Sequence, residues 1–249
     1  VGLALEARGV DVVVSYGDEP FALPRVLRSL PGQHLLVAPD SITAHAVVVS
    51  FDVSAIERLG VLRSAAESAE CFIAVDHHAS YTGFAPVSLV DVAAPATAVL
   101  ALELVDRLGV ELSVDIATAV YSGLVTDTGS FKYAGTTPGT HEVAARLMRT
   151  GMRHDVVARH IYDDEPFAAL RLLGAALDRA VLEETAVGGL GLVWTVVSRA
   201  ERDTLGLPLD AVERVIDVLR IATEAEVACV LKQDDTQAWR VSMRAKGHV

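Results

Sequence analysis

The residues best suited to chemistry follow an apolar run at positions 71–75, where Asp76, His77 and His78 stand next to one another. An apolar run of this length is typical of a strand buried on both faces of a parallel sheet. The polar triplet would then lie at the carboxyl edge of that sheet, where open α/β folds bind their ligands. A polar surface loop is the plainer interpretation. We favour a ligand site because two other carboxylates follow a similar pattern.

Those two carboxylates are Asp52, directly after the mainly apolar run at 47–51, and Asp127, in the turn Val125-Thr126-Asp127-Thr128-Gly129-Ser130-Phe131. Alone, each is explained by local capping or an Asx-turn. Asp52, however, precedes the triplet by one βα unit, so both are expected at the same sheet edge. Asp127 ends a predicted helix, where the dipole opposes a negative charge by a few tenths to about 1 kcal/mol. A positive charge, such as a divalent metal ion, is therefore expected near Asp127.

Carboxylates with an imidazole and no thiol favour Mn²⁺ or Mg²⁺ over a structural zinc ion, and the imidazole favours Mn²⁺ of these two. Such a site polarises a phosphoryl oxygen, and two ions generate a bound hydroxide for in-line attack. Side chains of consecutive residues diverge, so the two histidines need different roles. We assign His77 as a metal ligand, and His78 to the phosphate or to general acid catalysis.

The elements that position these residues predict an α/β first part. Short apolar runs at 10–15, 34–38, 46–50 and 71–75 alternate with helical patterns at 24–30, 55–62 and 97–108. Ser113 is expected to cap a helix at 114–125, and Thr137 another that begins at Pro138. This rhythm predicts a mostly parallel sheet with helices on both faces.

A long helix is predicted to connect this part to a smaller α+β module. Its apolar positions recur at helical spacing: Phe167, Leu170, Leu173, Leu177 and Val181. Strands are then expected at 190–197, 226–231 and 239–243, a helix at 209–221 and a hairpin turn at 233–237. The predicted domains are 1–163 for the first part, 164–184 for the connecting helix and 185–249 for the partial second module.

Composition restricts the partners. The 249 residues are 51% hydrophobic and carry a net charge of −12, which argues against a basic face for long duplex nucleic acid. The two cysteines, Cys71 and Cys229, lie in apolar runs and suggest buried free thiols in a reducing cytoplasm. No uninterrupted apolar stretch has transmembrane length and no signal-peptide pattern is present, so no membrane partner is expected.

The three motifs, in this order, resemble the DHH phosphoesterase superfamily, whose name motif is Asp76-His77-His78 here. Asp52 resembles its second motif and the segment 125–131 its fourth. The connecting helix and the segment 241–247 resemble the subgroup with a DHH-associated (DHHA1-like) substrate domain. Within that subgroup, the segments 131–133 and 136–141 are most similar to the bifunctional oligoribonucleases and pAp phosphatases, or nano-RNases.

The resemblance implies an enzyme that hydrolyses short oligoribonucleotides and 3′-phosphoadenosine 5′-phosphate (pAp), and in some members cyclic or linear dinucleotides. It implies two Mn²⁺ ions, with Mg²⁺ as the substitute, held by Asp52, His77 and Asp127, and a second domain that closes over the substrate. Substrate contacts are carried over to five residues: His78, Ser130, Lys132, Arg244 and Lys246. His78 and Asp127 are the expected catalytic residues, and relatives of this kind often form homodimers.

The family's first motif, with a His and two Asp, is expected before Val1, and a glycine-rich motif with a His beyond Val249. We therefore expect residues 1–249 alone to be inactive or nearly so. Other functions stay open: a nucleotide-binding or regulatory module without turnover, or a single-strand exonuclease of the same superfamily. The exonuclease needs a basic channel and stacking aromatics, and aromatic residues make up 5% of the chain. A dinucleotide-binding Rossmann domain lacks support because no Gly-x-Gly-x-x-Gly follows the first apolar run.

Overall fold

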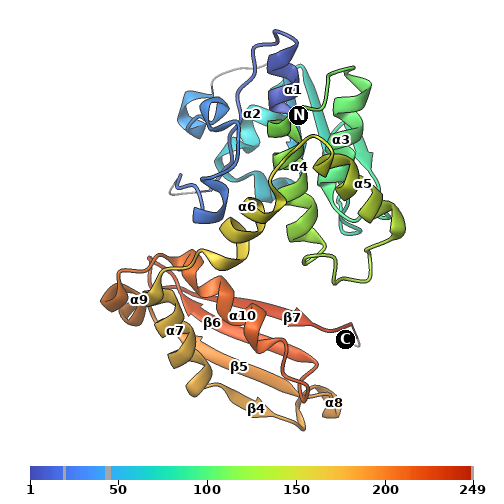
Figure 1. Ribbon diagram of the computed structural model, residues 1–249. Coiled ribbons are helices and arrows are strands. Elements are labelled where there is room, and N and C mark those ends of the chain that lie inside the picture. The colour runs from blue at the N-terminus through green and yellow to red at the C-terminus, as the bar shows by residue number, and fades with distance from the viewer. Residues whose placement is uncertain (19–20, 43–45, 248–249) are drawn as a thin grey trace. The chain divides into compact units, whose positions relative to one another are not determined.

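The computed structural model of the protein describes residues 1–18, 21–42 and 46–247. The chain divides into two compact units, Val1–Ile161 and Tyr162–Val249 (Figure 1). Among the described residues, no helix is both long enough and apolar enough to cross a bilayer.

The first unit contains a three-stranded parallel sheet. Its strands β1 (Val47–Phe51), β2 (Cys71–Asp76) and β3 (Val87–Val90) lie in the order β1-β2-β3. The register pairs Phe51 with Val75, so Asp52 and Asp76 emerge side by side at the carboxyl edge. The predicted parallel α/β sheet is confirmed, whereas β3 was not predicted. Three of its four residues are exposed, so it lacks the buried apolar run that identifies a central strand.

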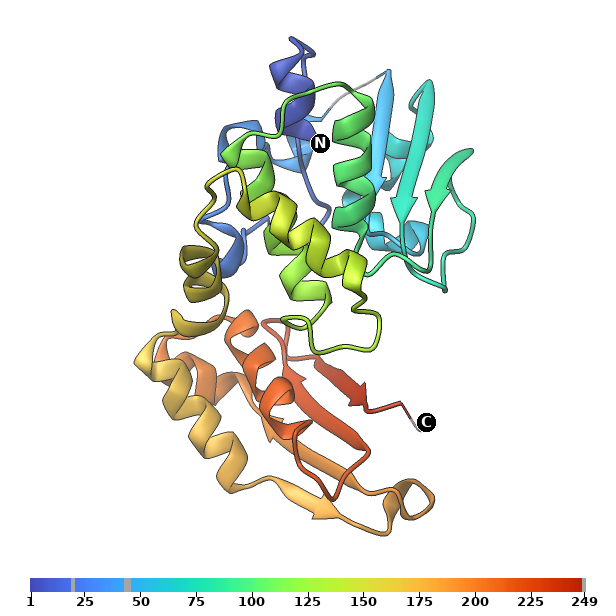
Figure 2. The same ribbon diagram turned by 45° about the vertical axis from the view of Figure 1, so that its right-hand side comes forward.

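Helices cover both faces of this sheet. Phe72 and Ala74 pack with Ala66 of α2 (Arg63–Glu67) on one face. Val75, which alternates with them, is fully buried on the opposite face, along which α3 (Thr97–Arg107) lies (Figure 2). Burial on both sides explains why the sequence of β2 is a continuous apolar run and does not alternate between apolar and polar residues.

The helix α4 (Val114–Asp127) brings Asp127 to its last position. Ser113 caps this helix by accepting a hydrogen bond from the Ile116 backbone at 3.2 Å, as predicted. The next helix, α5 (Pro138–Met148), begins with a capping box between Thr137 and Thr140. Both starts were predicted from the cap residues. The remaining helical elements of this part of the chain are α1 (Gly2–Ala7), η1 (Arg25–Leu27), η2 (Gln33–Leu35), η3 (Pro39–Ser41), η4 (Ile56–Leu62), α6 (His154–Ala158) and the π-helical turn η5 (Arg159–Asp163).

Two predicted strands of the first unit are absent from the described structure. In the runs at 10–15 and 34–38, the paired residues form an isolated parallel bridge between Val14 and Leu36. Gly32 has φ of 91° and starts a 3₁₀ turn at Gln33–Leu35, which leaves too little extended chain for a ladder. The helix predicted at 24–30 is likewise reduced to the 3₁₀ turn Arg25–Leu27.

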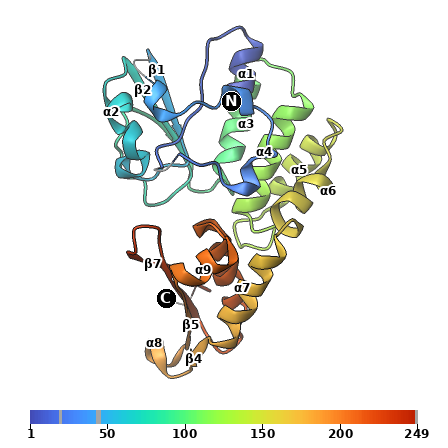
Figure 3. The ribbon, with the colours of Figure 1, turned by 90° about the vertical axis from the view of Figure 1, so that its left-hand side faces the viewer.

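The second unit contains a four-stranded sheet in the order β4-β5-β6-β7. The strands β5 (Leu192–Val197) and β6 (Val227–Gln233) are parallel, and β4 (Val181–Glu183) and β7 (Trp239–Ala245) flank them antiparallel. The helices α7 (Phe167–Asp178), α9 (Arg199–Leu205) and α10 (Glu213–Leu219) lie on the same face of this sheet (Figures 1 and 3). Two short elements, α8 (Ala186–Gly189) and η6 (Leu209–Val212), complete the unit.

The helix α7 is shorter than the predicted connecting helix at 164–184, and its predicted apolar stripe is buried only in part, because Leu173 and Leu177 pack against the core whereas Leu170 is exposed. It ends at Asp178, because Val181 pairs with Trp194 in the sheet. Phe167 is 76% exposed, whereas the small residues Ala169 and Ala176 are buried with Leu172 against the sheet. Alanine lets the helix approach the strands closely, and a search for large apolar residues does not detect such a face.

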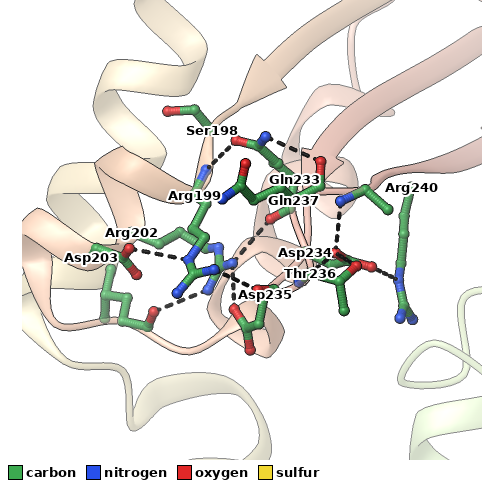
Figure 4. Close-up of polar contacts among 12 residues, drawn as sticks. Ser198, Arg199, Arg202, Asp203, Gln233, Asp234, Asp235, Thr236, Gln237 and Arg240 are labelled. Carbon is green, nitrogen blue, oxygen red and sulfur yellow. Dashed lines mark hydrogen bonds and ion pairs between the residues drawn. The ribbon is translucent and has the colours of Figure 1, made fainter.

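The predicted hairpin turn between β6 and β7 is confirmed. Asp234 is buried and accepts hydrogen bonds from Thr236 Oγ1 at 2.6 Å and from the Ala238 backbone at 3.0 Å. Arg240 contacts its second oxygen at 2.9 Å (Figure 4). Arg202 of α9, with a side chain 2% exposed, donates to Gln233 O at 3.0 Å and pairs with Asp235 at 2.8 Å. These contacts fix the turn on α9.

Candidate metal centre

Asp52 stands directly after β1 in a left-handed backbone conformation. Its φ is 62°, which is uncommon outside glycine but tolerated by aspartate, and its backbone N–H donates to Val75 O at 3.0 Å. Thr97, the first residue of α3, is 4% exposed and donates its hydroxyl hydrogen to Asp52 Oδ1 at 2.7 Å. The Asp52 carboxylate, half exposed, is therefore held by the adjoining strand and by a helix start.

The two histidines that follow β2 have different partners. His77 Nδ1 contacts Ala94 O at 3.1 Å, and a carbonyl only accepts, so this nitrogen carries the hydrogen and Nε2 keeps its lone pair. His78 Nδ1 lies 2.7 Å from Asp76 Oδ1. The rings meet edge to face at 4.8 Å between centroids. The prediction that the two neighbours need different roles is consistent with these separate contacts.

Donor atoms from three chain segments converge at this edge of the sheet. His77 Nε2 lies 3.6 Å from Asp52 Oδ1 and 3.9 Å from Asp127 Oδ2. His78 Nδ1 lies 3.8 Å from Asp52 Oδ1. Asp52, His77 and His78 each offer one ligand atom within 4.8 Å of the others. Ligand atoms at about 2.1 Å from an octahedral ion are about 3 to 4 Å apart, so these separations fit one shared cation.

The chain leaves α4 through a Schellman motif that fixes Asp127. The Ser130 N–H donates to Val125 O at 2.8 Å and the Gly129 N–H to Thr126 O at 3.0 Å, with Gly129 at φ of 55°. Gly129 ends the helix. A Cβ there would lie 2.4 Å from the Tyr133 ring, so close packing also requires glycine. The aspartate is thus the last residue of a helix whose end is fixed by these backbone hydrogen bonds.

The electrostatics of Asp127 indicate a need for positive charge. Burial raises the pKa of its carboxyl group above the ordinary 3.8, and the neighbouring Asp52 raises this pKa further. His77 and His78 act in the opposite direction. The helix end adds its own negative potential. A bound cation would relieve all three unfavourable interactions, and a set of two carboxylates with imidazoles suits Mn²⁺ or Mg²⁺. The residues present therefore fit a divalent metal ion.

Comparisons with known proteins agree with this geometry. No family model matches the chain. The chain is 30% identical over 229 residues to the bifunctional oligoribonuclease and PAP phosphatase NrnA of Thermus thermophilus, covering 91% of this chain and 65% of that protein. This similarity supports the resemblance of the chain to the DHH phosphoesterase superfamily.

Two further comparisons agree with this similarity. A probable bifunctional oligoribonuclease and PAP phosphatase NrnA of Streptococcus mutans is 22% identical over 177 residues, covering 71% of this chain and 52% of that protein. The crystal structure of an exopolyphosphatase-related protein from Bacteroides fragilis superposes with a TM-score of 0.86 at 22% identity, covering 98% of this chain and 73% of that one. The structural match establishes the fold. The chain spans 65% and 52% of the lengths of the two curated relatives.

The structure separates the other predicted site residues into two groups. Ser130 and Lys132 lie on the turn after Asp127, and Ser130 has φ of 59°. Arg244 and Lys246 lie in the second unit, on β7 and directly after it. Lys246 Nζ donates to Ala222 O, and Arg244 Nη1 donates to Met243 O at 2.9 Å, so both side chains make local backbone contacts.

Sequence reasoning missed three groups around this centre. Ala94 O holds His77, Thr97 holds Asp52, and Asp76 holds His78. Thr97 was predicted as the start of a helix, which gives no indication that its hydroxyl turns towards a carboxylate. Ala94 contributes only a backbone oxygen, for which the sequence carries no signal. Asp76 was recognised as part of the motif without a role of its own.

Proposed function

We propose that the protein of which this chain is a part is a metal-dependent phosphoesterase that hydrolyses short oligoribonucleotides and pAp. The observation that carries the proposal is the convergence of Asp52 Oδ1, His77 Nε2 and Asp127 Oδ2 on one sheet edge. The similarity to two proteins named as bifunctional oligoribonucleases and PAP phosphatases supports the substrate class. Cyclic and linear dinucleotides are further candidate substrates because they contain the same phosphodiester.

Asp52, His77 and Asp127 would hold the metal, for which the carboxylate and imidazole donors favour Mn²⁺. A pair of such ions supplies charge stabilisation at a phosphoryl oxygen and a hydroxide at neutral pH. Asp52 is suited to bridge two cations because its carboxylate has two oxygens and is half exposed. Its left-handed backbone and the Thr97 hydroxyl hold that carboxylate in one orientation before substrate arrives.

The remaining residues bind and orient the substrate. His78, 36% exposed at its side chain, would face the phosphate and, when its ring carries a hydrogen on both nitrogens, would supply the proton of Nε2 to the leaving oxygen. Ser130 and the exposed Lys132 follow Asp127 directly, where a hydroxyl and an ammonium group suit a phosphate. Arg244 and Lys246 are assigned to the terminal phosphate or base of the nucleotide.

The test is a substrate panel on the full-length protein with Mn²⁺ or Mg²⁺: di- to pentaribonucleotides, pAp, cyclic dinucleotides and long single-stranded RNA. We expect turnover of the short substrates and pAp, and a loss of about 100-fold or more for His77→Ala and Asp127→Ala. The matched controls, His34→Ala and Asp115→Ala, change exposed residues of the same unit and should retain full activity. Binding of these nucleotides without turnover would identify a regulatory module instead. Equal turnover of long RNA would identify a processive exonuclease.

A further inference from the structure

The carboxylate of Asp76 is the most deeply buried charged group at this sheet edge. Asp76 is the last residue of β2 and is 0% exposed. Its Oδ1 accepts hydrogen bonds from the His77 backbone at 2.8 Å and from the His78 backbone at 3.3 Å, in addition to the imidazole of His78. Its Oδ2 is buried without a hydrogen-bond partner. Burying a carboxylate in this way is unfavourable. Capping of the neighbouring backbone alone does not explain why this carboxylate is also in contact with the ring of His78.

The contact determines which nitrogen of His78 is available. Asp76 Oδ1 lies 2.7 Å from His78 Nδ1, and a carboxylate engaged by two backbone N–H groups can only accept. The hydrogen of neutral His78 therefore stands on Nδ1. A nitrogen that carries a hydrogen has no lone pair for a metal ion. Nε2 is left as the ring atom that reaches outward.

This excludes the ligand set that distance alone suggests. His78 Nδ1, at 3.8 Å from Asp52 Oδ1, is within reach of a cation held by Asp52 and His77. To ligate through that atom, His78 would have to release Asp76 and leave a fully buried carboxylate with only backbone donors. His77 has the opposite arrangement, because its Nδ1 is bound to Ala94 O and its Nε2 points to Asp52 and Asp127.

We propose that Asp76 is a positioning residue that divides the work of the two histidines. By holding Nδ1 of His78, Asp76 keeps this ring off the metal and directs its Nε2 to the phosphoester. The inference rests on the proposed phosphoesterase function and deepens it, because Asp76 acts on the substrate only through His78. The same arrangement in a Ser-His-Asp triad shows the size of the effect: replacing the aspartate by asparagine preserves geometry but lowers kcat about 10⁴-fold through the wrong tautomer.

The first experiment makes the same substitution at the two neighbouring histidines in the full-length protein. Asparagine places its side-chain N–H₂ near the position of Nδ1 and removes Nε2. We expect His77→Asn to weaken Mn²⁺ binding at least about 10-fold, measured by calorimetry, because its ligating atom is lost. His78→Asn should bind Mn²⁺ within about twofold of the wild type and lose about 100-fold in kcat. Equal weakening of Mn²⁺ binding by both variants would overturn the proposal.

The second experiment addresses Asp76 itself. In Asp76→Asn, ¹⁵N NMR of the metal-free protein should show His78 shifting from the Nδ1–H form towards the Nε2–H form. Mn²⁺ affinity should stay within about twofold, and kcat should fall about 10- to 100-fold with little change in KM. The control is Asp91→Asn, an exposed aspartate directly after β3 at the same sheet edge. It should change neither the spectrum nor the kinetics. A wild-type spectrum with hydrogen on Nε2 of His78 would refute the inference.

The two proposals fail in different ways. If no phosphoester is hydrolysed by the wild type, the proposed function is wrong, while the NMR and Mn²⁺ measurements still decide the role of Asp76. If the wild type is active but His78→Asn and Asp76→Asn retain full kcat, the phosphoesterase stands and the positioning role is wrong. Should Asp76→Asn fail to fold, the wild-type ¹⁵N spectrum of His78 together with the His77→Asn and His78→Asn pair decides the question without it.

Discussion

Thr97 Oγ1 donates a hydrogen bond of 2.7 Å to Asp52 Oδ1, and this contact joins the first residue of α3 to the residue that follows β1. The threonine is buried, so water does not compete for its hydroxyl. The Asp52 side chain is half exposed, so this hydrogen bond from a buried donor restricts its orientation. The orientation of the carboxylate assigned to the metal is therefore set by a residue 45 positions away.

The first prediction concerns this hydroxyl. Thr97→Val preserves the shape of the side chain but leaves Asp52 Oδ1 without its donor, so Mn²⁺ affinity should fall about 10-fold. Calorimetric titration with Mn²⁺ measures this directly. Thr97→Ser is the control, since it keeps the hydroxyl and should bind within about twofold of the wild type. If Thr97→Val binds Mn²⁺ as tightly as Thr97→Ser, the hydrogen bond does not support the site.

The strands that carry the site were predictable, because a strand buried on both faces has a continuous apolar sequence that is easily recognised. The run before Asp76 is apolar throughout, and parallel strands bring their carboxyl ends to one edge. Asp52 and His77 could therefore be placed together from sequence alone. Asp127 needed a second argument, the unfavourable position of a carboxylate at a helix end.

The other elements and contacts could not be predicted, because they depend on residues far apart in the sequence or on faces without large apolar side chains. β3 is mostly exposed and has no buried run, and the predicted strand at 10–15 is reduced to a bridge at Val14. The buried face of α7 consists largely of alanine, so the larger residue Phe167 misled the assignment. The contacts of Ala94 and Thr97 with the site depend on tertiary folding and leave no pattern in the sequence.

The second prediction concerns the turn after Asp127. Gly129→Ala introduces a Cβ 2.4 Å from the Tyr133 ring and forces a side chain into φ of 55°. We expect a loss of about 3 kcal/mol in the free energy of unfolding, from backbone strain and overpacking together. Gly109→Ala is the control: its φ is 65°, but no atom lies within 4 Å of the added Cβ. It should cost about 1 kcal/mol in urea unfolding. Equal losses in both variants would show that the Tyr133 contact is not restrictive.

The third prediction separates stability from metal binding at Asp127. Because the pKa of this carboxyl is raised, the folded state holds its proton more tightly than the unfolded state does. Its contribution to stability is therefore greatest in acid and is lost as the pH rises through the folded-state pKa. Without metal at neutral pH, Asp127→Asn should raise the melting temperature. With Mn²⁺, the wild type should gain stability by binding the ion and the variant should gain little.

Thermal melts with and without Mn²⁺ test this expectation. Asp115→Asn serves as the control because Asp115 lies in the first turn of the same helix, where a negative charge is favourable. That variant should be slightly less stable than the wild type, and Mn²⁺ should stabilise both equally. A metal-free Asp127→Asn protein that melts below the wild type at neutral pH would contradict the electrostatic account.

The fourth prediction concerns the hairpin of the second unit. Hydrogen bonds from Thr236 and Arg240 lower the pKa of Asp234 from 3.8 to about 2. A carboxyl group whose pKa is lowered by folding stabilises the folded state above its ordinary pKa, and this contribution is lost as the pH falls towards the folded-state value. Asp234→Asn should therefore be less stable than the wild type at neutral pH, and the difference should shrink between about pH 5 and about pH 2.

Urea unfolding at a series of pH values, from about pH 7 to about pH 3, measures this difference. Asp217→Asn on the exposed side of α10 is the matched control and should follow the wild type throughout. Thr236→Val removes the hydroxyl that contributes most to the shift, so its pH dependence should resemble that of Asp234→Asn. A difference between Asp234→Asn and the wild type that stays constant over the whole range would show that the charge of Asp234 does not stabilise the turn. The asparagine would then act only through lost hydrogen bonds, which do not titrate.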